Sequence, residues 1–296
     1  MLAAAIATTS CSMARLGYDV LPTWTHWQVE RYLDLDDAQR DIVSRHVDDL
    51  HRWHRRTQLP DYAAFLREAD ERLRGEVDAE EFGRWRDRAM QAWAPIAERL
   101  APGVAELGLT LREDQIRRMR ERFAESNEKQ REQMLPARGE TREQARAERL
   151  VKRAEFFLGR LTSAQVREIT TLAAALPPNE EAWLAEREAR QRGFVRLLER
   201  LRKEQPSRAE ARRMAREYLL AMWHSHEARR GHRIERSIEA GDAFAVRVLA
   251  MASAKQREHL SKLLTGFASD FDKLSRRGGD APHAGDDGAA RTVAQR

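Results

Sequence analysis

Apolar side chains recur at intervals of three and four residues along most of the chain. One such series is Val166, Ile169, Ala173 and Leu176. This spacing is the period of an α-helix with one buried face. No stretch alternates apolar and polar residues with an enrichment in β-branched side chains, as a half-buried strand would. The pattern therefore predicts an all-α fold, built as an elongated multi-helix bundle.

A short motif marks four places where a helix should begin. In each copy a Gln stands three residues after the position that would cap the helix. The copies are Leu35–Gln39, Leu111–Gln115, Leu161–Gln165 and Ser253–Gln256. An Asp, Thr or Ser at the cap position can accept a hydrogen bond from a free backbone N–H, while the Gln reaches back to the cap residue's own N–H. The motif thus predicts capped helix starts and indicates no chemistry by itself.

One copy departs from this rule, and other residues should interrupt the helical pattern. Arg112 cannot cap a helix through its side chain, so we expect Thr110 with Glu113 to cap that helix one turn earlier. The helix that begins after Asp36 should end near residue 57, before Pro60, because proline lacks the backbone N–H that a helix needs. A further break is expected near Gly241.

The last residues differ in composition from the rest of the chain. Residues 276–296 are rich in Gly, Asp and Ala and offer almost nothing to bury, which predicts a disordered tail. No flexible linker divides the preceding residues. We therefore predict a single elongated all-helical domain over residues 12–275.

The chain is basic and highly charged. It has 296 residues, of which 34% are charged, with a formal net charge of +5 and a sequence pI near 9.6. Acidic and basic residues alternate in runs such as Arg142 with Glu143, and this mixture favours a solvated helix surface. A nucleic-acid-binding protein would need clustered basic charge. We expect no nucleic acid as partner, and a basic helical nucleic-acid-binding protein remains an alternative interpretation.

The N-terminal residues suggest processing and lipid attachment. A short apolar run from Met1 leads through small residues to Cys11, which is the one cysteine of the chain. Such a run is too short to span a membrane and is typical of a signal peptide. We predict a signal peptide over residues 1–11 that ends at a lipidated Cys11. The run lacks the usual basic residues, so the true start could lie upstream, and an incidental cysteine in a frayed terminus is the alternative.

Several short segments resemble one family. They are Cys11 with Ser12, Arg15–Tyr18, Tyr32–Asp36 with Gln39, Trp53–Arg56, Leu59–Ala63, Leu176–Pro178 and Trp183–Arg187. In this order they resemble a proteobacterial domain-of-unknown-function family of helical lipoproteins, over roughly Cys11 to Leu274. The resemblance implies a lipid-anchored envelope protein and no established activity. In lipoproteins resembling this one the cysteine carries three acyl chains, and Ser12 in place of Asp suggests the outer membrane, facing the periplasm.

No motif for catalysis or for a metal is complete. Glycine-rich phosphate loops are absent, and His226–Arg230 has Arg where a zinc-protease motif needs its second His. We therefore predict no enzyme activity, no catalytic residue, no metal and no cofactor. The candidate binding surface consists of Trp53 with His54 and of Trp183 with Leu184.

These observations predict a lipid-anchored cell-envelope lipoprotein with a non-catalytic binding or structural role. The alternative is a periplasmic holdase, because Leu-Thr-x-x-Gln helix starts are similar to those of the small chaperones of the Spy and CpxP type. Its partners would be unfolded or envelope proteins, gripped by exposed apolar surface near Trp183 and Leu184.

Two tryptophans lie just after the predicted anchor. Trp24 and Trp27 could rest in the headgroup region of a membrane, where tryptophan is enriched. They could instead pack the first helix onto the bundle. We expect packing, because Tyr32 and Leu33 continue the apolar surface toward a core.

Overall fold

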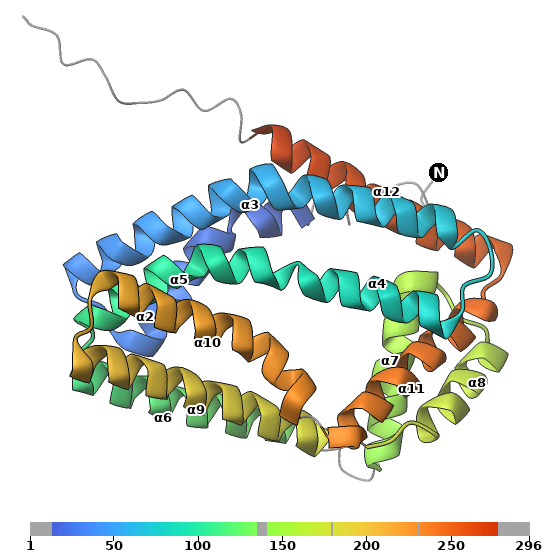
Figure 1. Ribbon diagram of the computed structural model, residues 1–296. Helices are drawn as coiled ribbons and strands as arrows, with labels where there is room; N and C mark the ends of the chain where they lie inside the picture. The colour runs from blue at the N-terminus through green and yellow to red at the C-terminus, as the bar shows by residue number, and fades with distance from the viewer. Residues whose placement is uncertain (1–13, 135–140, 179, 230, 278–296) are drawn as a thin grey trace, which may run out of the picture.

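The structure is a computed structural model that describes residues 14–134, 141–178, 180–229 and 231–277, with the backbone alone described for residues 223–229 and 231–235. These residues form a bundle of helices and include no strand, which confirms the predicted all-α fold (Figure 1). A helical segment over residues 14–19 precedes the labelled helices. The helices are α2 (Leu21–Leu33), α3 (Asp37–Arg72), α4 (Ala79–Gln91), α5 (Trp93–Thr110), α6 (Glu113–Met134), α7 (Arg142–Leu158), α8 (Ser163–Ala174), α9 (Glu180–Glu204), α10 (Arg208–Arg229), α11 (Gly231–Ala250) and α12 (Ala254–Arg277).

The helices form an elongated frame. The long helix α3 packs along α12 at one edge, and α6 packs along α9 at the opposite edge (Figure 1). Between these edges α5 packs against α10, while α7, α8 and α11 lie together at one end. Neighbouring helices therefore pack along their lengths, as expected for a bundle.

The first core joins α5, α9 and α10. Ala97, Ala101 and Ala105 are almost fully buried and recur every four residues along one face of α5. Small side chains on this face let the neighbouring helices approach closely. Gly108 continues the face, where an added Cβ would lie 2.6 Å from Cδ1 of Leu201. Any larger residue at this position would have to displace that buried leucine.

Two further cores lie at the two ends of α3. Val43 near its start belongs to a core with residues of α2, α6 and α9. Leu66 and Leu73 near its end pack against a core formed by α7, α8, α11 and α12. At 36 residues, α3 is about 54 Å long at the α-helical rise per residue. It is therefore the element that connects the two ends of the molecule.

Two expected helix breaks do not occur. The helix α3 runs without interruption through Pro60, although proline should have ended it. Leu59, just before this proline, and Ala63, three residues after it, are 1% and 0% exposed, and α12 packs along α3. Packing outweighs the loss of one intrahelical hydrogen bond. In the same way α11 continues through Gly241. At the C-terminus α12 extends to Arg277, and the rest of the predicted tail lies outside the described residues.

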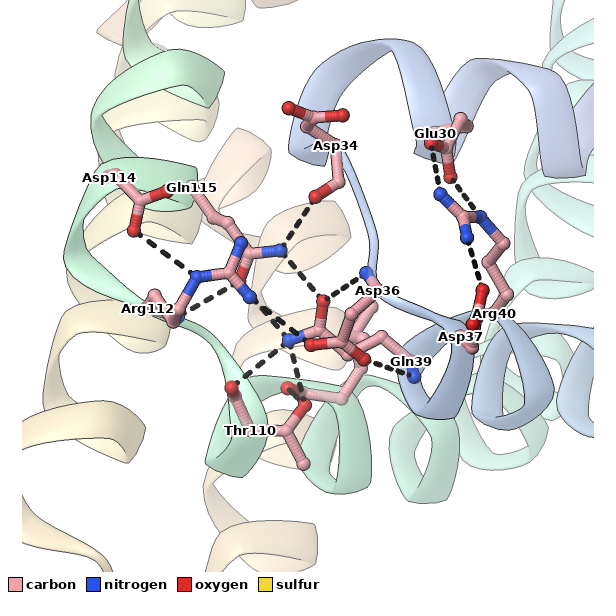
Figure 2. A network of polar contacts seen from close by, with 11 residues as sticks. Glu30, Asp34, Asp36, Asp37, Gln39, Arg40, Thr110, Arg112, Asp114 and Gln115 are labelled. Atoms are coloured by element: carbon pink, nitrogen blue, oxygen red, sulfur yellow. Dashed lines mark hydrogen bonds and ion pairs between the residues drawn. The ribbon is translucent and has the colours of Figure 1, made fainter.

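Two of the predicted helix starts meet through their glutamines (Figure 2). Nε2 of Gln39 donates to Oε1 of Gln115 at 3.1 Å, and Nε2 of Gln115 donates to Oε1 of Gln39 at 2.7 Å. Nε2 of Gln39 also donates to the carbonyl of Thr110 at 3.0 Å, and Nε2 of Gln115 donates to the carbonyl of Asp34 at 3.0 Å. Each of these carbonyls lies just before the helix of the partner glutamine. Each Oε1 also accepts a hydrogen bond from the backbone N–H of the residue three positions earlier, which is Asp36 for Gln39 and Arg112 for Gln115. We call this arrangement the first glutamine clasp.

The other two helix starts form a second glutamine clasp with the same bonds. Gln165 and Gln256 exchange side-chain hydrogen bonds of 2.8 and 3.0 Å. Their Nε2 atoms donate to the carbonyls of Met251 and Arg160, at 2.9 and 3.0 Å. In both clasps the accepting carbonyl lies five residues before the partner glutamine. The clasps thus connect α3 to α6 and α8 to α12, across 76 and 91 residues of sequence.

The predicted capping boxes are confirmed at three of the four helix starts. Both reciprocal bonds are present after Asp36, Thr162 and Ser253. The predicted cap by Thr110 is wrong, because Thr110 ends α5 and its hydroxyl donates to the carbonyl of Leu107 at 2.8 Å. Instead, the N–H of Arg112 donates to Oε1 of Gln115 at 2.9 Å. The glutamine of the motif reaches back here without a hydroxyl or carboxylate cap.

Candidate functional site at the docked N-terminal segment

The helical segment over residues 14–19 is attached to α3 and α12. Nε of Arg15 lies 3.1 Å from Oδ1 of Asp270, a residue of α12 that is only 1% exposed. Burial raises the pKa of the Asp270 carboxyl, and the positive charge of Arg15 opposes that rise. A buried carboxylate without a cation would be costly, so the ion pair ties this segment to the bundle.

A cluster of aromatic and imidazole rings makes the second attachment. The hydroxyl of Tyr18 lies 2.9 Å from Nδ1 of His54, and its ring stacks on His51 with centroids 4.7 Å apart. Nε2 of His51 donates to the carbonyl of Tyr18 at 3.2 Å. Arg55 donates to Asp19 at 2.5 Å, and its guanidinium lies 5.4 Å from the centre of the Tyr18 ring. Three residues of one α3 face therefore hold the segment.

The protonation of this cluster follows from its burial. Burial, with a smaller contribution from His51, lowers the pKa of His54 to about 4. Burial raises the pKa of Tyr18 to about 12. At neutral pH the imidazole of His54 is thus uncharged and the phenol keeps its proton. The Tyr18 hydroxyl can donate to Nδ1 of His54 in one tautomer of the neutral imidazole and accept from Nδ1–H in the other.

The structure separates the two parts of the predicted binding surface. Trp53 is half-buried on α3 and meets His54 edge to face, with centroids 6.3 Å apart. Trp183 and Leu184 are half-buried near the start of α9. Leu184 lines a surface hollow of about 430 Å³ together with residues of α6 and α7, and neither Trp53 nor His54 lines that hollow. His54 has a defined role in holding the N-terminal segment, and Cys11 lies outside the described residues.

The expected packing of Trp24 and Trp27 is wrong. Both side chains are 54% exposed, while Val29, Tyr32 and Leu33 of the same helix pack into the core. The apolar surface that continues toward the core belongs to the last turns of α2. The sequence spacing could have predicted a separate exposed face, because residues 16, 20, 24 and 27 follow a helical period of their own.

The rest of the described surface offers little for chemistry. The described residues contain no group of three or more His, Cys, Asp or Glu side chains that could hold a metal ion. A hollow of about 810 Å³ lies between α6 and α9 and is open and lined by charges of both signs. Two of its arginines, Arg120 and Arg131, pair with Glu199 and Glu188 across the hollow. None of the helices in the described part of the chain combines the length and hydropathy that a membrane crossing needs.

Residues 31–225 match the family of unknown function DUF6279. The chain belongs to this family. The match spans the first clasp and Gln165 but ends before Gln256, and it includes Trp53, His54, Trp183 and Leu184. No curated protein and no solved structure matches the chain. The family match thus covers most of the bundle and leaves its activity open.

Proposed function

We propose that this DUF6279 protein is a lipid-anchored cell-envelope protein with a structural or binding role and no catalytic activity. Its anchor is Cys11, and its place is the outer membrane, facing the periplasm. The observation that carries the proposal is the docking of the segment just after Cys11 through the Arg15–Asp270 ion pair and the Tyr18–His54 hydrogen bond.

The distance between the anchor and the first docking contact is short. Arg15 follows Cys11 by four residues, which span at most about 14 Å of extended chain. A lipid on Cys11 would therefore hold the bundle against the bilayer, with no long tether. Docking at α3 and α12 would transmit that attachment to the two ends of the frame, since both helices run along its edge. This arrangement suits a rigid body kept at a membrane surface.

The strength of the anchor follows from its chemistry. Acyl chains contribute about 0.8 kcal/mol per buried CH₂ group, so a single chain binds reversibly and several chains hold a protein permanently. The three chains implied by the family resemblance would leave the protein membrane-bound throughout its life. A folded domain held in this way needs no membrane-spanning helix.

The surface charges favour this proposal over nucleic-acid binding. Arginines of the described surface are widely paired with carboxylates, as in the contacts of Arg213 with Glu210 and Glu217 and of Arg99 with Asp49. Such pairs spread charge of both signs over the helices. A phosphate backbone is instead bound by basic side chains gathered on one face.

The test is the location of the protein when the anchor is removed. We expect Cys11→Ser to move the protein from the membrane fraction to the soluble periplasmic fraction and to abolish labelling by radioactive fatty acid. Ser10→Ala is the matched control, because it alters a neighbouring residue and keeps the thiol. Ser12→Asp should shift the lipidated protein toward the density of inner membranes. A wild-type protein that is unlabelled and soluble would overturn the proposal.

A further inference from the structure

Most of the large apolar side chains that are exposed in the described part of the chain lie in its first helices. Five of the seven large apolar side chains that are exposed in the described residues lie between positions 16 and 27. They are Leu16 at 58%, Val20 at 57%, Leu21 at 42%, and Trp24 and Trp27 at 54% each. We call them the N-terminal apolar face. Monomeric soluble proteins rarely gather so many large apolar groups in one exposed patch, so this face is expected to have a partner.

The face is continuous across the junction between the first helical segment and α2. The N–H of Val20 donates to the carbonyl of Leu16 at 3.2 Å, and the N–H of Trp24 donates to the carbonyl of Val20 at 3.0 Å. These are helical bonds, so the turn at Val20 does not redirect the chain. Leu16, Val20, Trp24 and Trp27 follow one another at intervals of four, four and three residues. Side chains at such intervals lie on one side of a helix.

The opposite side of the same helices is attached to the bundle. Arg15 and Tyr18 contact α12 and α3, and further along Tyr32 and Leu33 pack into the core. The N-terminal apolar face therefore points away from the protein because the other face is already occupied. Rotating the helix to bury the tryptophans would expose the core residues and break the buried ion pair of Asp270.

The composition of the face suits the headgroup region of a bilayer. Two of its five members are tryptophans, which favour the boundary between water and acyl chains. The guanidinium of Arg31 lies 5.5 Å from the centre of the Trp27 ring, which places a cation beside the apolar patch, where lipid phosphates would lie. Leu16 follows Cys11 by five residues, so a lipid on Cys11 would keep the face within about 18 Å of the bilayer.

We propose that the N-terminal apolar face lies in the interface of the membrane that holds the lipid anchor, parallel to its surface. This inference rests on the proposed anchoring at Cys11 and adds a second contact, which fixes the orientation of the bundle. A lipid anchor alone lets a protein rotate about one point. An amphipathic helix lying in the interface removes that freedom, because its apolar side must stay at the depth of the headgroups.

The experiment measures the depth of the tryptophans. The full-length lipidated protein is placed in phosphatidylcholine vesicles whose acyl chains are brominated close to the headgroup, and quenching of tryptophan fluorescence is recorded. We expect quenching in the wild type and loss of most of it in Trp24→Phe with Trp27→Phe. Trp183→Phe is the matched control, since it removes one distant tryptophan and should keep the quenching. Equal quenching in the wild type and the Trp24/Trp27 double variant would overturn the inference.

A second arm separates the face from the anchor. Full-length Cys11→Ser protein is mixed with the same vesicles, with and without Leu16→Ser and Trp24→Ser. Co-sedimentation that these two changes reduce would support the face even if the anchor proposal failed. A soluble dimer of the Cys11→Ser protein that the same two changes dissociate would assign the face to a second copy and overturn the inference. Because both side chains are exposed, helical circular dichroism should be unchanged throughout.

Discussion

The two glutamine clasps share their bonds and differ in their surroundings. In the first clasp Gln39 and Gln115 are each 1% exposed. In the second, Gln256 is 7% exposed and Gln165 is half-buried. The pattern of side-chain bonds is nevertheless the same in both. The comparison indicates that the hydrogen-bond pattern arises wherever two such helix starts face each other. The contribution of each clasp to stability depends instead on how far water is excluded from its amides.

The residues four positions before the glutamines also differ between the two clasps. In the first clasp these residues are Leu35 and Leu111, both 3% exposed and both in the core shared by α2, α6 and α9. In the second clasp they are Leu161, at 9%, and the smaller Ala252. The second clasp thus lies beside less apolar side-chain volume, and its glutamines are more exposed than those of the first clasp.

The largest effect is expected from Gln115→Leu. The change removes the hydrogen bonds that Gln115 makes with Nε2 and Oε1 of Gln39 and with the carbonyl of Asp34. Unsatisfied buried polar groups destabilise by 1–3 kcal/mol, so we expect a loss of about 3 kcal/mol of unfolding free energy in urea titrations. The double variant Gln39→Leu with Gln115→Leu should cost less than the sum of the single changes, because it removes both polar partners. Strict additivity would contradict a coupled pair.

The equivalent change in the second clasp should cost less. We expect Gln256→Leu to lower the unfolding free energy by about 2 kcal/mol, because water can reach the half-buried Gln165 and replace part of what is lost. Gln144→Leu is the matched control, since Gln144 completes a capping box at the start of α7 and joins no clasp. An equal loss for Gln256→Leu and Gln144→Leu would mean that the pairing adds nothing to the caps.

Acidification should distinguish the clasps from the docked N-terminal segment. The clasp glutamines carry no titratable group, whereas the folded-state pKa of His54 is lowered from 6.5 to about 4. The unfolded chain therefore binds more protons between these values, and stability should fall as the pH drops from about 6.5 toward 4. His54→Gln should flatten this part of the pH profile in urea titrations. A profile unchanged by the substitution would mean that other groups cause the acid sensitivity.

The smallest effects concern the cap residues themselves. Thr162→Ala should cost about 1 kcal/mol by removing the acceptor for the N–H of Gln165. The reverse change can be made in the first clasp, where Arg112→Thr would add the missing cap and should stabilise by about 0.5 kcal/mol. Chemical denaturation of both variants measures whether the unfolding free energy falls in Thr162→Ala and rises in Arg112→Thr. Loss of stability in Arg112→Thr would show that the ion pair of Arg112 with Asp36 matters more than a cap.

Local patterns determined most of the secondary structure. The helical period of the apolar residues and the capping boxes after Asp36, Thr162 and Ser253 could be predicted because each depends on groups only a few residues apart. Breaks at Pro60 and Gly241 were predicted by the same local logic and do not occur, since packing of α3 against α12 and of α11 against its neighbours outweighs local preference.

Tertiary structure decided which of these elements meet and which side each presents. The sequence identifies four similar glutamines but not that Gln39 pairs with Gln115, because contacts across 76 residues depend on the packing of whole helices. It identifies His54 as a candidate, yet its partner Tyr18 lies 36 residues away. Trp24 and Trp27 were expected in the core and are exposed, because the other side of their helix already fills the available contact with the bundle. Periodicity gives a helix its two faces, and only the neighbouring helices decide which face is buried.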